Sequence, residues 1–283
     1  MVMDGVEIFS FDQPNTKGRP SEDYCWIGIK NAISFAVADG VSRTRNVLHE
    51  GEVITSQAAA RIFCHQAAFG FARRKTIHEA FALANAAIGE MNKGVGITPE
   101  TVDYLDCDYL CCTAIAGVLM ESPDRLVYGC IGDCGLLVYD ADYMPVFLTE
   151  NNVAILEEFR DCRRFSDKNE RRIFWRKELR NRCARFMTYG ALTGEPSALA
   201  QIKYGYVDLQ PGDTVVLFSD GIYPFIFYEM FRVTVTNLLM SSVTEAEIRE
   251  IMRAYMQGAT MRLRDQGAKN LDDDKTMIAF RLK

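Results

Sequence analysis

Four groups of aspartates stand beside runs of apolar residues that have the length and composition of buried β-strands. Asp39-Gly40 follows Ile33–Ala38, Gly132-Asp133 follows Leu126–Ile131, Asp220-Gly221 follows Thr214–Ser219, and Asp272-Asp273-Asp274 precedes Thr276–Phe280. Carboxylates delivered by several strand ends repel one another unless a positive charge lies between them. Oxygen ligands suit hard cations such as Mg²⁺ or Mn²⁺. One Asp-Gly pair is an ordinary turn signal, but the four groups together predict a metal site.

The absence of several known motifs disfavours alternative catalytic chemistries. None of the nine cysteines begins a Cys-x5-Arg motif, so a phosphocysteine mechanism is disfavoured. The sequence has neither a Gly-x4-Gly-Lys-Ser/Thr phosphate loop nor a Gly-x-Ser-x-Gly elbow. Asp106-Cys107-Asp108 resembles the Asp-x-Asp of aspartyl-phosphate enzymes, but it precedes its strand instead of following it. We therefore interpret it as a loop.

The composition narrows the class of protein. A net charge of −6 disfavours a general nucleic-acid binder. No apolar stretch reaches the roughly 20 residues that a membrane span needs, and the first residues lack the pattern of a secretory signal. The cysteines are odd in number and lack zinc-site spacing, which favours buried, reduced thiols. We expect a soluble cytoplasmic protein that binds neither nucleic acid nor membrane.

The order of the expected elements favours an α+β fold with antiparallel sheets over a doubly wound one. Strands are expected at 4–11, 24–30, 33–38, 109–120, 125–131, 135–140, 145–148, 202–208, 214–219 and 276–280, and helices at 50–72, 77–91 and 244–265. Residues 151–186 are expected to be mostly helical. No repeat or flexible linker interrupts the chain, so a single domain over residues 1–283 is expected.

Residues 151–186, called the basic segment below, differ from the rest of this acidic chain. Between Arg160 and Arg185 they hold eleven Arg or Lys residues against four acids. The sequence leaves two interpretations open. The excess charge attracts anionic substrates such as phosphorylated chains, or it forms a solvated helical face.

A series of short motifs spans nearly the whole chain in a distinctive order. The motifs are Arg19-Pro20-Ser21-Glu22-Asp23, Phe35–Val41 with Gly51-Glu52-Val53, Cys112–Ala116, Gly129–Cys134, Leu209–Gly221, and Asp273-Asp274-Lys275-Thr276. In kind and order they resemble the motifs of the PPM (protein phosphatase 2C-like) family of metal-dependent serine/threonine phosphatases. Each motif is weak alone, and the six in this order are specific.

The resemblance implies a fold and an activity. The fold is a four-layer α/β/β/α sandwich of two mostly antiparallel sheets flanked by helix pairs, with the basic segment in the place of a variable, flap-like insertion. The activity is hydrolysis of phosphoserine or phosphothreonine in proteins, opposing a Ser/Thr kinase, by a water that bridges two Mg²⁺ or Mn²⁺ ions. A third, weaker ion is also implied.

The resemblance also implies roles for individual residues. Asp39 would bridge the two ions with the Gly40 carbonyl as a further ligand, and Asp220 and Asp273 would complete the first ion's shell. Asp133 would hold the third ion together with Asp220. Asp273 is preferred to its neighbours because its spacing to Thr276 matches the family motif. Arg19 would bind the substrate phosphate, and Glu22 or Asp23 would order metal-bound waters.

The chain departs from the family pattern at a few positions. Cys111-Cys112 replaces paired glycines, Cys134-Gly135 replaces Ser-Arg, and Arg19 lies one residue closer to Asp23 than usual, which leaves Lys17 as a substitute. Some relatives carry a histidine after the Asp-Gly pair, where this chain has Val41. We therefore expect no general acid among His49, His65 and His78.

Every implied metal ligand is retained, so an active enzyme is expected. Two alternatives stay open at this point. One is a catalytically silent PPM-like signalling or binding module, and the other is a phosphatase of a small phosphorylated molecule.

Overall fold

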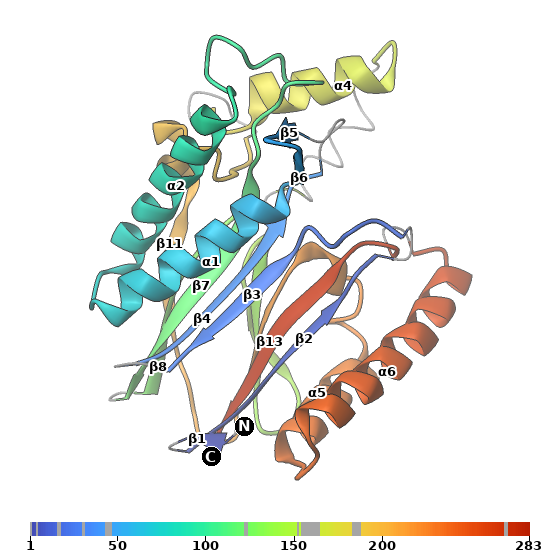
Figure 1. Ribbon diagram of the computed structural model, residues 1–283. Helices are drawn as coiled ribbons and strands as arrows, with labels where there is room; N and C mark the ends of the chain where they lie inside the picture. The colour runs from blue at the N-terminus through green and yellow to red at the C-terminus, as the bar shows by residue number, and fades with distance from the viewer. Residues whose placement is uncertain are drawn as a thin grey trace.

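Two β-sheets stack face to face in the computed structural model, and a pair of helices covers the outer face of each sheet (Figure 1). The structure describes residues 2–3, 5–15, 18–29, 32–42, 47–121, 124–151, 153, 165–182, 188–268 and 271–283. The expected α+β class and the four-layer α/β/β/α arrangement are confirmed.

The first sheet has six strands in the order β1-β2-β13-β12-β9-β10. Their bounds are β1 (Val2–Met3), β2 (Val6–Gln13), β9 (Gly135–Tyr139), β10 (Pro145–Leu148), β12 (Thr214–Phe218) and β13 (Lys275–Leu282). Every pairing is antiparallel. Because β2 pairs with β13 along its whole length, the two ends of the chain lie side by side in this sheet.

The second sheet has five antiparallel strands in the order β11-β8-β7-β4-β3. Their bounds are β3 (Tyr24–Gly28), β4 (Ile33–Gly40), β7 (Cys112–Glu121), β8 (Asp124–Ile131) and β11 (Lys203–Asp208). Side chains alternate along β4: Ala36 and Ala38 face the helices, while Phe35 and Val37 face the other sheet. Because both faces are covered, the strand reads as a continuous apolar run.

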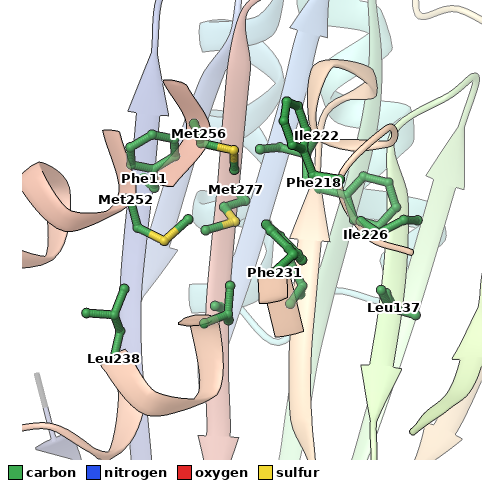
Figure 2. Packing of buried hydrophobic residues seen from close by; sticks show 14 of the residues in the cluster. Phe11, Leu137, Phe218, Ile222, Ile226, Phe231, Leu238, Met252, Met256 and Met277 are labelled. Atoms are coloured by element: carbon green, nitrogen blue, oxygen red, sulfur yellow. The ribbon is translucent and has the colours of Figure 1, made fainter. Parts of the chain in front are cut away.

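The layers are held together by three apolar clusters. Between the sheets, the rings of Phe35 and Phe280 stack with centroids 4.4 Å apart. Helices α1 (Gln57–Ala72) and α2 (Ile77–Gly94) cover the second sheet, and α5 (Glu229–Met240) and α6 (Glu245–Asp265) cover the first. Figure 2 shows the cluster under α5 and α6, where Met252 and Met256 lie over the first sheet near Phe11. None of the described helices has the length and apolar character that crossing a membrane requires.

The structure corrects several expected elements. The helix expected from residue 50 begins at Gln57, because residues 47–54 form a hairpin of β5 (Val47–His49) and β6 (Glu52–Ile54). Its turn residues, Glu50 and Gly51, have positive φ angles of 52° and 85°, as a type I′ turn requires. The strand expected from residue 109 begins at Cys112, and α5 had no counterpart among the expected elements.

The basic segment is helical over α4 (Lys168–Phe174) and a π-helical turn, η1 (Trp175–Leu179). Residues 152, 154–164 and 183–187 lie outside the described residues, so the expectation for them is not tested. In Figure 1, α4 lies at the same end of the molecule as the β5–β6 hairpin.

Candidate active site

Strand direction brings the acidic groups to one end of the sandwich. β4 and β8 both pair antiparallel with β7, so they run in the same direction and their C-terminal ends lie at the same end of the second sheet. Asp39 lies at the end of β4, and Asp133 follows the end of β8. In the first sheet β12 ends beside the start of β13, which places Asp220 near Asp273. The four carboxylates and three arginines, Arg171, Arg172 and Arg176, line one cavity of about 330 Å³.

Of the three consecutive aspartates, Asp273 lines the cavity and its two neighbours have other contacts. Asp272 forms an ion pair with Arg264 at 2.8 Å. The buried carboxylate of Asp274 accepts hydrogen bonds from the backbone N–H groups of Asn15 and Glu22, at 2.6 and 2.7 Å. Asp274 therefore fastens the N-terminal loop to the site.

Burial and mutual repulsion dominate the electrostatics of the cavity. Burial, as the largest cause, raises the pKa of Asp39 and of Asp220 well above the usual aspartate range. Neighbouring carboxylates, among them Asp23, Asp133 and Asp273, raise both pKa values further. Without a cation, the carboxyl groups of the cavity resist ionising together. A cation between them would offset the mutual repulsion of their ionised forms.

The donor set fits a hydrated hard cation. The aspartates offer only oxygen atoms, the ligands that Mg²⁺ and Mn²⁺ prefer. Within the described residues, no cluster of three or more His, Cys, Asp or Glu side chains is compact enough to hold a metal ion by itself. Mg²⁺ commonly binds through one or two carboxylates and keeps several waters. Carboxylates spread around a cavity suit such an ion better than they suit zinc, whose structural sites are closed.

Close backbone contacts explain the glycines after Asp39 and Asp220. A Cβ atom at Gly221 would lie 1.8 Å from the carbonyl oxygen of Asp274. A Cβ atom at Gly40 would lie 2.6 Å from the backbone of Ser56. Only glycine lets these chain segments approach so closely, so the glycines shape the loops that carry the carboxylates.

Glu22 and Asp23 lie beside the cavity lining. The Ser42 hydroxyl donates to the Glu22 carboxylate at 2.5 Å, and burial raises the pKa of Glu22. The Ser219 hydroxyl donates to the Asp23 carboxylate at 2.7 Å. Burial, with added repulsion from Asp274, raises the pKa of Asp23 to about 7. Both carboxylates thus lie next to the cluster without lining the cavity.

Arg19 is not brought together with the aspartates. Its side chain is exposed and does not line the cavity. Lys17, the substitute considered from the sequence, lies outside the described residues. The arginines that line the cavity come from the basic segment instead.

The buried carboxylate of Asp108 holds the basic segment in place, a role that could not be predicted from the sequence. Asp108 lies in a loop, as expected, and accepts from Arg180 at 2.6 and 3.1 Å, while Nε of Arg176 lies 3.1 Å from the same carboxylate. The side chains of Asp108 and Arg180 are each 1% exposed. Arg176 also donates to the carbonyl oxygens of Tyr104 and Ser42, at 3.2 and 3.0 Å.

The departures from the family motifs have simple structural consequences. Cys134 is buried, and its sulfur lies 3.4 Å from the hydroxyl of Thr113. Val41 lines the cavity, whereas His49 lies in β5, His65 in α1 and His78 in α2, and none of the three lines it.

Comparisons with solved structures identify the class of fold. The magnesium complex of RsbX is 11% identical with a TM-score of 0.56, and the match covers 100% of this chain and 98% of that one. The serine/threonine phosphatase PstP/Ppp of Mycobacterium tuberculosis is 15% identical with a TM-score of 0.55, covering 98% and 99%. The photosystem II phosphatase PBCP is 17% identical with a TM-score of 0.60, covering 99% of each chain. At such low identity these likenesses show the fold.

The family follows from the sequence model of protein phosphatase 2C, which matches residues 14–261. The chain therefore belongs to the protein phosphatase 2C family, and the resemblance to PPM-type phosphatases is confirmed. No curated protein matches the sequence.

Proposed function

We propose that this protein hydrolyses phosphoserine and phosphothreonine in proteins and depends on two Mg²⁺ or Mn²⁺ ions, with a weaker third. The observation that carries this proposal is the meeting of four aspartates, from strand ends of both sheets, in one cavity with arginines. The opposing enzyme would be a Ser/Thr kinase. The family membership and the fold shared with PstP/Ppp and the magnesium-bound RsbX support the proposal.

The proposed ligands follow from the lining of the cavity. Asp39, with the carbonyl of Gly40, would lie between the two ions, and Asp220 and Asp273 would complete the first of them. Asp133 would hold the third ion together with Asp220. Divalent cations in such a site acidify water and neutralise phosphoryl oxygens.

The chain's own groups would bind and orient the reactants. Arg19 remains our proposed phosphate ligand, although reaching the cavity requires its exposed side chain to turn inward. Glu22 and Asp23 would orient waters from beside the cavity. Val41 has no proton to give and no histidine lines the cavity, so we expect an ordered water to protonate the leaving alkoxide. Alkyl phosphates should therefore react more slowly than activated aryl phosphates.

Release of phosphate from a phosphothreonine peptide, an aryl phosphate and a panel of small metabolite phosphates tests the proposal. Metal-stripped protein should be inactive on all of them, and added Mn²⁺ should restore turnover of the peptide. Asp39→Ala and Asp220→Ala should abolish it, while Asp265→Ala, an exposed position on α6, should not.

Three results would overturn the proposal. Full turnover in excess chelator would exclude metal dependence. Turnover of metabolites without peptides would show a small-molecule phosphatase, and no turnover at all in the presence of bound Mn²⁺ would show a silent binding module.

Asp133→Ala should keep tight metal binding yet lose most turnover, and wild-type turnover at saturating Mn²⁺ would contradict its assignment to a third ion.

A further inference from the structure

Two of the three arginines in the cavity have no anionic partner within the described part of the chain. Arg176 lines the cavity but is committed to Asp108. Arg171 and Arg172 line the same cavity, and neither forms an ion pair or a side-chain hydrogen bond with any described residue. A guanidinium group presents five donors suited to carboxylate or phosphate. The cavity therefore offers two uncommitted guanidinium groups beside its carboxylates.

The helix that carries these arginines is fixed to the protein core. Arg172 lies four residues before Arg176, and Arg171 lies four residues before Trp175, which also lines the cavity. The two arginines therefore both border the cavity, on the side of α4 and η1 that also carries Trp175 and Arg176. Asp108 and the carbonyl oxygens that Arg176 contacts hold this face in position. Preorganised groups bind with a smaller ordering cost than mobile ones.

The charges in the cavity favour anion binding by these two arginines. The proposed divalent cations would engage the four carboxylates of the cavity, so Arg171 and Arg172 are the groups in its lining that are available to a second anionic group. An anionic group beside the reacting phosphate can contact Arg171 and Arg172, because they line the same cavity as the four aspartates. Lys168 and Lys177 on the same helical segment are exposed and do not line the cavity, so they are not placed to contact an anion inside it.

We infer that Arg171 and Arg172 form a second anion subsite, which selects phosphoproteins that carry another acidic group next to the phosphorylated residue. The shared chemistry is a second anion, supplied by a carboxylate side chain or by a second phosphate. This inference rests on the proposed function and adds a substrate class to it.

The test compares three matched phosphothreonine peptides with neutral amide, carboxylate or second-phosphate neighbours. Their non-hydrolysable phosphonate analogues give dissociation constants by calorimetry, and the peptides themselves give KM and kcat. The variants are Arg171→Gln/Arg172→Gln and, as a control with the same change of charge, Lys168→Gln/Lys177→Gln. Wild type and control should bind the acidic analogues about tenfold more tightly than the neutral one, as expected for two partly exposed ion pairs.

In the double arginine variant this preference should fall to about unity, through KM and not kcat. The carboxylate and second-phosphate arms show which anion the subsite prefers. Equal binding of acidic and neutral analogues by wild type would overturn the inference, and so would equal loss of preference in both double variants. Selective binding without turnover would instead reject only the proposed function, because the dissociation constants do not depend on catalysis.

Discussion

Replacing Asp23 by Asn should stabilise the metal-free protein, and the gain should grow as the pH rises. Asp23 is buried, and burial with repulsion from Asp274 raises its pKa to about 7. The folded state therefore binds this proton more tightly than the unfolded state. The stability that the proton contributes is present at acid pH and is lost as the pH rises through the folded pKa. Asn never ionises, and its carbonyl oxygen still accepts from the Ser219 hydroxyl.

The size of the effect follows from the pKa shift. A rise from 3.8 to about 7 corresponds to at most about 4 kcal/mol, of which roughly 2.5 kcal/mol falls between about pH 5 and pH 8. Sharing of protons with Asp39 and relaxation around the site reduce this figure. We expect the variant's advantage over wild type to grow by about 1–2 kcal/mol, or roughly 2–8 °C in Tm.

Thermal unfolding in excess chelator, followed across that pH range, measures this difference. Asp265→Asn, an exposed change on α6, is the control and should show no such trend. Saturating Mn²⁺ should shrink the advantage of Asp23→Asn, because a cation favours the ionised cluster. A difference between variant and wild type that is independent of pH in chelator would refute the electrostatic reasoning.

Three further predictions concern side chains around the site. Asp108→Asn should speed hydrogen exchange across residues 168–182 while both sheets stay protected, and unchanged exchange would contradict this. The reason is that the change leaves the buried guanidinium groups of Arg176 and Arg180 without a negative partner, at a cost of about 3–5 kcal/mol. Lys275→Met should raise the Mn²⁺ concentration needed for half-maximal activity about tenfold, because buried Lys275 positions the loop of Asp273 by donating to the carbonyl oxygens of Leu271 and Asp273 at 2.8 and 2.9 Å. An unchanged Mn²⁺ activation curve would exclude that positioning role. His78→Gln should leave turnover within about threefold, and a loss of 10²-fold would restore a histidine as general acid.

The strands that carry the aspartates could be predicted because the signal is local. A buried strand in this sandwich is covered on both faces, so it appears in the sequence as a short apolar run that ends in Asp-Gly. Helix α5 could not be predicted in this way. Its residues include Val233, Thr234, Val235 and Thr236, which favour strands, and no side chain caps its start. Packing of its apolar side chains on the first sheet stabilises the helix instead.

The site shows the same division between local and distant information. The aspartates on the strand ends could be selected because motif and strand coincide along the chain. The ion pair of Asp108 with Arg180 could not, because 72 residues separate the partners. The same holds for the position of Arg19, since nothing in its spacing to Asp23 says whether its side chain points into the cavity. Charge alone does not distinguish Arg176 from Arg171 and Arg172 in the sequence, and only the structure shows that Arg176 is committed to Asp108.

Anomalous diffraction from crystals soaked in Mn²⁺ tests the central claim most directly. We predict Mn²⁺ peaks inside the cavity, with oxygen atoms of Asp39, Asp220 and Asp273 at about 2.2 Å from the metal, and loss of these peaks in Asp39→Ala. An empty cavity at saturating Mn²⁺, or peaks only at other surface carboxylates, would contradict the account.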